Sequence, residues 1–147
     1  MATPRFRRVN IDGRSLFKTE TRLAGTAVLP GTVVAINGDD EFDNVTTYTG
    51  DQRVYVADVG YHQGLGIMDA NPAGDSMVGN YVEPGREFAG RFAASTALIK
   101  DQAVTVGAGG LFVAAAAEAD PASIIAFSQE TVTLPAGAQD FIRLRTA

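Results

Sequence analysis

The C-terminal third of the chain decides the predicted fold. It reads ALIKDQAVTVGAGGLFVAA from Ala97 to Ala115 and, after an Ala/Asp/Pro linker, IIAFSQETVTLPAGAQDFIRLR from Ile124 to Arg145. Short runs of β-branched and aromatic residues, broken by Gly and Pro, are typical of strands joined by tight turns. This stretch therefore predicts a small β-meander.

The first half of the chain echoes this plan. Residues 27–34 lie over residues 97–104 at an offset of 70, and the turn Pro72–Gly74 lies over Pro135–Gly137 at an offset of 63. The two offsets require a gap of seven residues. We expect this gap in the acidic loop Asn37–Asn44, which is long for a hairpin turn.

These patterns predict an all-β fold, either a small antiparallel β-barrel or a jelly-roll-like β-sandwich. An extended basic N-terminal arm, residues 1–22, precedes a single β-rich domain, residues 23–147. The domain divides into pseudo-repeats of about residues 23–92 and 95–147. The alanine-rich run 113–119 favours helix locally but is too short to stand alone.

Composition excludes several classes of site. The 147 residues contain no cysteine, so disulfides, Fe–S clusters and Cys-ligated zinc are ruled out. The single histidine, His62, rules out a polyhistidine metal site within one subunit. The longest apolar run, 111–117, is far shorter than the ~20 residues that cross a bilayer, and the N-terminus lacks the apolar core of a signal peptide. We therefore expect neither a membrane partner nor secretion.

Charge is distributed unevenly. Residues 1–22 contain six basic residues against Asp12 and Glu20, a net charge of +4, so the remainder of this −5 chain carries −9. A basic arm with aromatic residues suits phosphates, but an acidic body repels nucleic acid. An acidic protein surface is the better partner for the arm.

No catalytic constellation emerges. The turn Gly107–Gly110 lacks the last glycine and the helix of a dinucleotide loop. Alternating acids from Asn37 to Asp43 fail both registers of an EF-hand loop, which leaves a solvated acidic loop or, at most, a weak cation site at Asp39–Asp43. His62 has no nucleophile beside it, and the tyrosines form no obvious platform for a glycan. We expect no enzyme activity, cofactor or metal.

The stretch from Leu98 to Ala115 resembles the head-decoration, or capsid cement, proteins of tailed bacteriophages. In that group a strand–turn–strand of the form x-Lys-Gly-Asp-x-Val-Thr-Val-Gly-x-x-Gly precedes an Ala-rich stretch. An acidic-Thr-Val strand and a Pro-Ala-Gly turn then lead into the last strand, as residues 130–145 do here. Asp101 replaces the usual Gly and Gln102 the usual Asp. The resemblance covers about a third of the chain.

The resemblance implies a structural, non-enzymatic virion protein. It would be made in the bacterial cytoplasm and bind the outer capsid surface in many copies, where it clamps adjacent subunits of the major capsid protein. Its partners would be that protein and itself, as a homodimer or homotrimer. The alternative is a small β-barrel trimer that binds a ligand or hydrolyses a nucleotide, although the chain lacks the Ser-Gly and Asp-rich motifs of such an enzyme.

The candidate capsid contacts all lie in the arm. We expect deletion of residues 1–20 to leave the body folded and to abolish binding. The candidate residues are Arg5, Phe6, Arg7, Arg8, Arg14, Phe17, Lys18 and Arg22.

Overall fold

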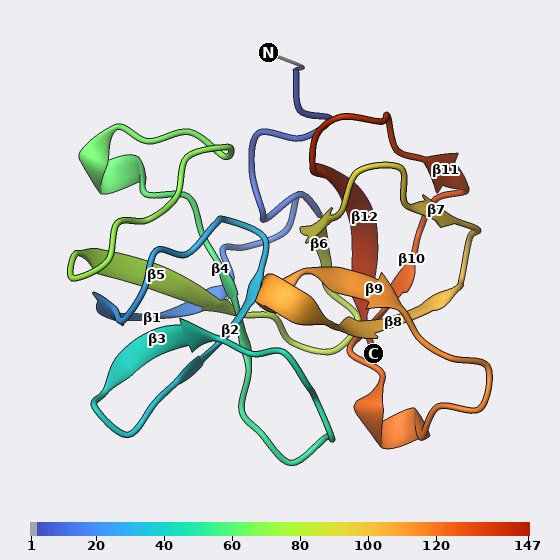
Figure 1. Ribbon diagram of the computed structural model, residues 1–147, viewed down its shortest axis with the longest axis horizontal. Helices are drawn as coiled ribbons and strands as arrows, with labels where there is room; N and C mark the ends of the chain where they lie inside the picture. Colours follow the sequence, from blue (N-terminus) through green and yellow to red (C-terminus); the bar gives the residue numbers. More distant parts are fainter. Residues whose placement is uncertain (1–2) are drawn as a thin grey trace.

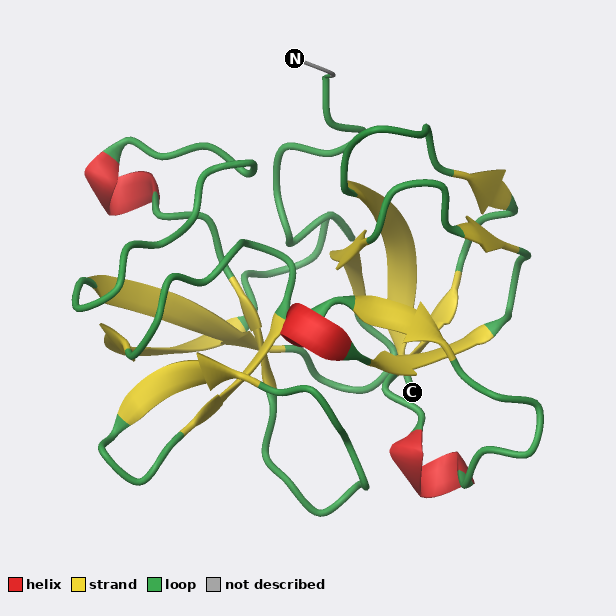
Figure 2. Cartoon of the chain, in the orientation of Figure 1, coloured by secondary structure: helices red, strands yellow, loops and turns green. Residues whose placement is uncertain are grey.

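Strands dominate the computed structural model, which describes residues 3–147 (Figure 1). The all-β prediction is confirmed: the only helical segments of the described residues are three single 3-10 turns (Figure 2). The 3-10 turns are η1 (Tyr61–Gln63), η2 (Ala108–Gly110) and η3 (Pro121–Ser123). Within residues 3–147, no helix is long and apolar enough to cross a membrane.

The first half of the chain closes into a five-stranded barrel. Its strands are β1 (Lys18–Ala24), β2 (Val33–Ile36), β3 (Glu41–Asn44), β4 (Tyr55–Ala57) and β5 (Ser76–Tyr81). They follow the order β1-β3-β2-β4-β5, and β5 pairs with β1 to complete the ring. All ladders are antiparallel except the short β1–β3 pairing. The rings of Phe42 and Tyr55 fill the interior beside Gly79, where a Cβ would lie only 2.6 Å from the Phe42 ring.

The second half repeats this strand order. Its main strands are β6 (Glu87–Phe92), β8 (Ala103–Val106), β9 (Phe112–Ala114), β10 (Ala126–Ser128) and β12 (Asp140–Thr146). The sheet runs β6-β12-β10-β8-β9, which matches β1-β5-β4-β2-β3 strand for strand. A two-stranded ribbon of β7 (Ala97–Leu98) and β11 (Val132–Thr133) corresponds to the isolated bridge between Val28 and Asn71. The echo in the sequence therefore reflects a repeated topology.

The seven extra residues of the first half do not lie in the acidic loop. Cross-strand partners Val34–Asn44 and Val104–Ala114 keep the same offset of 70, so the β2–β3 and β8–β9 hairpins match. Residues 58–75 join β4 to β5, whereas residues 129–139 join β10 to β12. The insertion thus lies in the loop that carries η1, hereafter the η1 loop (residues 58–75). The acidic residues instead form a tight turn, in which the Asn37 side chain accepts from the backbone N–H groups of Asp39 and Glu41.

Two expected boundaries also shift. Strand β1 begins at Lys18, inside the expected arm of residues 1–22, and β6 belongs to the second sheet although the expected first repeat extends to residue 92. The start of β1 was missed in the sequence because the polar side chains of this strand face outward, so that most of the strand alternates between exposed and half-buried positions. That pattern resembles a solvated arm when the partner strands are unknown.

The two halves share one core. Val33 and Val56 of the barrel pack in the same cluster as Phe88, Phe92 and Phe112 of the second sheet. The Phe112 ring lies 5.5 Å from that of Phe88 and 5.9 Å from that of Phe92, within the range of favourable aromatic pairs. Gly110 packs against Asn44 and the Val33 carbonyl of the first half, a contact that leaves no room for a side chain.

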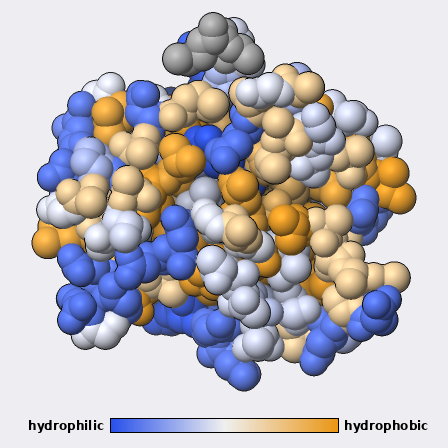
Figure 3. Space-filling model, viewed as in Figure 1, coloured by the Kyte–Doolittle hydropathy of each residue, from blue (hydrophilic) through white to orange (hydrophobic). Residues whose placement is uncertain are grey.

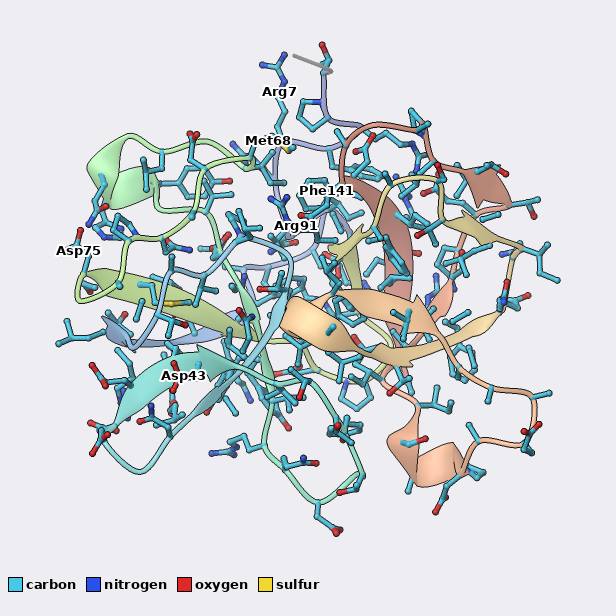
Figure 4. All side chains as sticks on the ribbon, viewed as in Figure 1. Arg7, Asp43, Met68, Asp75, Arg91 and Phe141 are labelled. Atoms are coloured by element: carbon cyan, nitrogen blue, oxygen red, sulfur yellow. The ribbon has the colours of Figure 1, made fainter. Side chains whose placement is uncertain are left out.

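Arg91 of β6 joins the halves from within, beside Phe141 (Figure 4). The residue is 1% exposed. Its guanidinium donates to the Pro30 carbonyl at 2.7 Å, the Ile67 carbonyl at 2.6 Å and Gln139 Oε1 at 3.1 Å. It also lies 4.8 Å from the centre of the Phe141 ring. Burial lowers the pKa of Arg91 to about 10, which still leaves it protonated at neutral pH.

Candidate partner-binding surface

The N-terminal segment, residues 3–17, is docked on the chain's own body. It descends between the two halves and leads into β1 (Figure 1). Val9 is 0% exposed and Phe17 is 5% exposed, and the Val9 carbonyl accepts from the backbone N–H of Ala89 at 2.8 Å. Phe6 and Ile11 pack in a cluster that includes Ile67 and Phe141, one from each half. The segment is therefore part of the fold, and the expectation that the body folds without residues 1–20 does not agree with this packing.

One end of the segment is held by an ion pair with the loop after β10. The Arg5 guanidinium contacts the Glu130 carboxylate at 2.5 Å and donates to the Phe141 carbonyl at 2.9 Å. Burial alone would raise the pKa of Glu130, but hydrogen bonds from Arg5 and from the Arg143 backbone outweigh it, so the pKa is lowered.

The other end wraps around Arg86. Asp12 Oδ2 lies 2.5 Å from Arg86 Nε, and Asp12 Oδ1 accepts from Arg86 Nη2 at 3.1 Å. The Ser15 carbonyl accepts from the same guanidinium, which lies 4.7 Å from the centre of the Phe17 ring. The hydrogen bond from Arg86 is the main reason why the pKa of Asp12 falls to about 2. Residues 12–17 are thus fixed in place.

The structure divides the eight candidate residues into two groups. Phe17 is buried and Phe6 is half-buried beneath Arg5, while Arg5, Lys18 and Arg22 make ion pairs with carboxylates of the chain itself. The carboxylates are those of Glu130, Glu83 and Asp40. Arg7, Arg8 and Arg14 are exposed, and their guanidinium groups pair with no carboxylate among the described residues. The sequence suggested that the basic residues of the arm meet acidic residues of a partner protein. For Arg5, Lys18 and Arg22, the acidic residues belong to the same chain.

Two of the unpaired arginines border a groove, which we call the Arg8–Tyr61 groove. It has a volume of about 370 Å³ and lies between the N-terminal segment and the η1 loop. Leu16 is 86% exposed and Tyr61 is 55% exposed along it. Burial raises the pKa of Asp58, which also lines it. The lining residues are Arg8, Asn10, Gly13, Arg14, Leu16, Asp58 and Tyr61.

Sequence reasoning identified Arg8 and Arg14 but missed Leu16 and Tyr61. The signal for Leu16 is its position beside Phe17, because successive side chains of an extended chain point to opposite faces. If Phe17 is buried, Leu16 must face solvent. Tyr61 gave no such signal, because it lies in the η1 loop, which is seven residues longer than the corresponding loop of the second half.

The η1 loop is held against the barrel by polar contacts. His62 Nε2 lies 3.0 Å from the Ser76 carbonyl of β5, and within the loop the Gln63 amide donates to Asp75 at 3.2 Å. His62 therefore fastens the loop to β5. The acidic turn is likewise engaged, since Asp40 pairs with Arg22 and Asp43 accepts from Asn37. No group of three or more metal-ligating side chains occurs in the part of the chain that the structure describes.

A second hollow lies between the halves. It has a volume of about 330 Å³, and three of the four tyrosines line it: Tyr48, Tyr55 and Tyr81. Tyr55 is buried and donates to Glu20, and Arg53 lies 5.4 Å from the centre of the Tyr81 ring. Arg53 is the one charged side chain of its lining, which includes no carboxylate side chain for the metal ion of a nucleotide hydrolase.

The surface is mixed rather than uniformly charged. In Figure 3, hydrophilic residues cover the lower left, where the β2–β3 hairpin lies in Figure 1, and apolar residues are scattered over the middle of this face. Such a surface favours contacts that combine ion pairs with apolar side chains.

Among known proteins, the chain is matched by solved structures and not by sequence. No protein-family model matches the chain, and no curated protein is similar to it in sequence. Among solved structures, the chain resembles the base of the head fibre gp8.5 of bacteriophage phi29, with a TM-score of 0.59. The match covers 90% of this chain and 95% of the other at 18% identity. The two proteins share a fold.

Proposed function

We propose that this chain is a structural protein of a bacteriophage virion, held in many copies on the outside of the capsid. The observation that supports this most is the likeness to a head-fibre base over 90% of the chain. The resemblance of Leu98–Ala115 to capsid decoration proteins points independently to the same kind of particle.

The N-terminal segment supplies the attachment in this proposal. Arg7, Arg8 and Arg14 project from a molecule whose residues after 22 carry a net charge of −9. A protein of that charge approaches an acidic capsid surface favourably only with its arginines turned towards it. Each exposed ion pair contributes only about 0–1 kcal/mol, so several must act together and apolar contacts must add to them.

Clamping is the mechanical part of the proposal. A copy that contacts two neighbouring major capsid subunits opposes their separation, and the same contact repeats over the whole shell. Self-association as a homodimer or homotrimer would multiply the contacts of each copy. Sedimentation velocity of the free protein tests that association.

Co-sedimentation with expanded capsid shells assembled without this protein tests the proposal. We expect saturable binding at a fixed ratio to the major capsid protein. Arg7→Glu/Arg14→Glu should weaken binding at least tenfold, whereas the control Arg53→Glu/Lys100→Glu, which makes the same change in net charge elsewhere, should bind as the wild type does. No binding of the wild type to such shells would contradict the proposal.

A further inference from the structure

We infer that the Arg8–Tyr61 groove binds an extended acidic segment of the major capsid protein and that this segment places a large apolar side chain against Leu16 and Tyr61. The inference rests on the proposed function and specifies its contact. The groove lies where two features meet that the internal repeat does not explain: the N-terminal segment and the seven-residue insertion of the η1 loop.

Leu16 is exposed on a backbone that is held in place on both sides. The carbonyl of Ser15 accepts from Arg86, and Phe17 is buried against the same guanidinium. The backbone on both sides of Leu16 is thus fixed, while the side chain itself is 86% exposed. A leucine held in this position can bury apolar surface on a partner with little further loss of conformational entropy.

Tyr61 is held on the opposite wall in a similar way. Its backbone N–H donates to the Val59 carbonyl at 2.8 Å, and its carbonyl accepts from Gly64 at 3.0 Å. His62 contacts the Ser76 carbonyl of β5, and Gln63 donates to Asp75 within the loop. Tyr61 is 55% exposed, so it offers an apolar ring edge together with a hydroxyl group. Tyrosine is among the residue types that most often dominate the energetics of protein interfaces.

The charges of the groove select an acidic occupant. Arg8 and Arg14 line it without carboxylate partners in the described chain, against the single carboxyl group of Asp58. The Asp58 side chain also accepts from the Val59 backbone N–H at 2.8 Å, so it is already engaged. Two guanidinium groups in the same groove as Leu16 and Tyr61 fit a segment with Asp or Glu on either side of a large apolar residue.

Other occupants fit less well. A nucleic acid needs a row of cationic contacts along its phosphates, whereas Arg8 and Arg14 are the only basic residues of the described chain that line the groove. The acidic turn of a second copy, residues 37–43, is a poorer occupant, because its Asp40 already pairs with Arg22 and its Asp43 already accepts from Asn37. A volume of about 370 Å³ holds a few side chains, which matches a single strand of polypeptide rather than a folded domain.

Site-specific cross-linking identifies the occupant, and the absence of cysteine from the chain makes it direct. Leu16→Cys is labelled with a photoreactive maleimide, bound to saturation on capsid shells and irradiated. Ile99→Cys is the control, because Ile99 is 64% exposed on the other half. We expect Leu16→Cys to cross-link to an acidic segment of the major capsid protein and Ile99→Cys to give no such product. Products with a sister copy or with nucleic acid, or no product at saturation, would overturn the inference.

An affinity measurement separates this inference from the function on which it rests. Leu16→Ser should bind shells at least tenfold more weakly, which is about 1.4 kcal/mol, while Ile99→Ser binds as the wild type does. Both variants should melt like the wild type, since both side chains are exposed. If the wild type binds shells and Leu16→Ser binds equally well, the groove is not the contact although the proposed function stands. If the wild type does not bind, the proposed function itself fails.

Discussion

At the residue scale, Arg91 connects three stretches of chain that are far apart in sequence. Its acceptors lie before β2, in the η1 loop and just before β12. A buried arginine without a carboxylate in direct contact is unusual, since desolvation of the charge must be offset by hydrogen bonds. Two backbone carbonyls and the Phe141 ring provide that compensation here.

Replacing Arg91 with leucine should destabilise the protein by about 3–5 kcal/mol, because buried carbonyls of Pro30 and Ile67 lose their donor. Arg91→Lys keeps the charge but cannot reach three separate acceptors, so we expect an intermediate loss. Urea unfolding followed by circular dichroism measures both. A loss below about 1 kcal/mol for Arg91→Leu would show that the halves do not depend on this residue.

Asp12 makes stability sensitive to acid. Its pKa falls from 3.8 to about 2 in the folded protein. A lowered pKa means that the stabilising contribution is fully present above pH 3.8 and is lost as the pH falls towards 2. The melting temperature should therefore drop over this interval, and it should drop less steeply in Asp12→Asn, which lacks the titrating group. Asp39→Asn, at an exposed position of the acidic turn, is the control and should keep the wild-type slope.

At the element scale, much of the fold is readable from the sequence. Apolar runs separated by Gly and Pro mark β8, β9 and β12, and the paired offsets identify the repeat from the order of amino acids alone. Strand β1 is not readable in this way, because its ladders to β3 and β5 come from distant parts of the chain. The insertion is misplaced by sequence reasoning because the acidic turn is more conspicuous than the η1 loop.

The N-terminal segment provides the prediction at this scale. Deleting residues 1–20 removes Val9 and Phe17 from the core and the first three residues of β1. We expect loss of cooperative unfolding, because the barrel can no longer close fully along β5. Deletion of residues 1–4 leaves these contacts in place and should preserve the transition. Differential scanning calorimetry distinguishes the two, and a sharp transition in the longer deletion would show that the segment is dispensable.

At the scale of the whole molecule, the candidate site was only partly predictable. The uneven charge of the sequence pointed to the N-terminal segment, and the structure shows that Arg7, Arg8 and Arg14 are exposed there. Composition could not show that Arg5, Lys18 and Arg22 find carboxylates on the same chain, since those partners are distant in sequence. The groove itself depends on the η1 loop, whose position only the folded chain reveals.

Salt should weaken attachment in a graded way. The unpaired arginines are exposed, so their attraction to an acidic surface is screened over about 8–10 Å at physiological ionic strength. We expect the apparent affinity for shells to fall as NaCl is raised, and to fall less steeply for Arg7→Glu/Arg14→Glu. Co-sedimentation across a salt series measures this. Equal salt dependence in both proteins would place the charged contact elsewhere.

Cryo-electron microscopy of capsid shells saturated with the protein tests the central claim most directly. The account predicts repeated density on the outer surface into which the two-half fold fits, with residues 5–16 and the η1 loop turned towards the major capsid protein. Shells without added density, or density in which the N-terminal segment faces away from the shell, would contradict it.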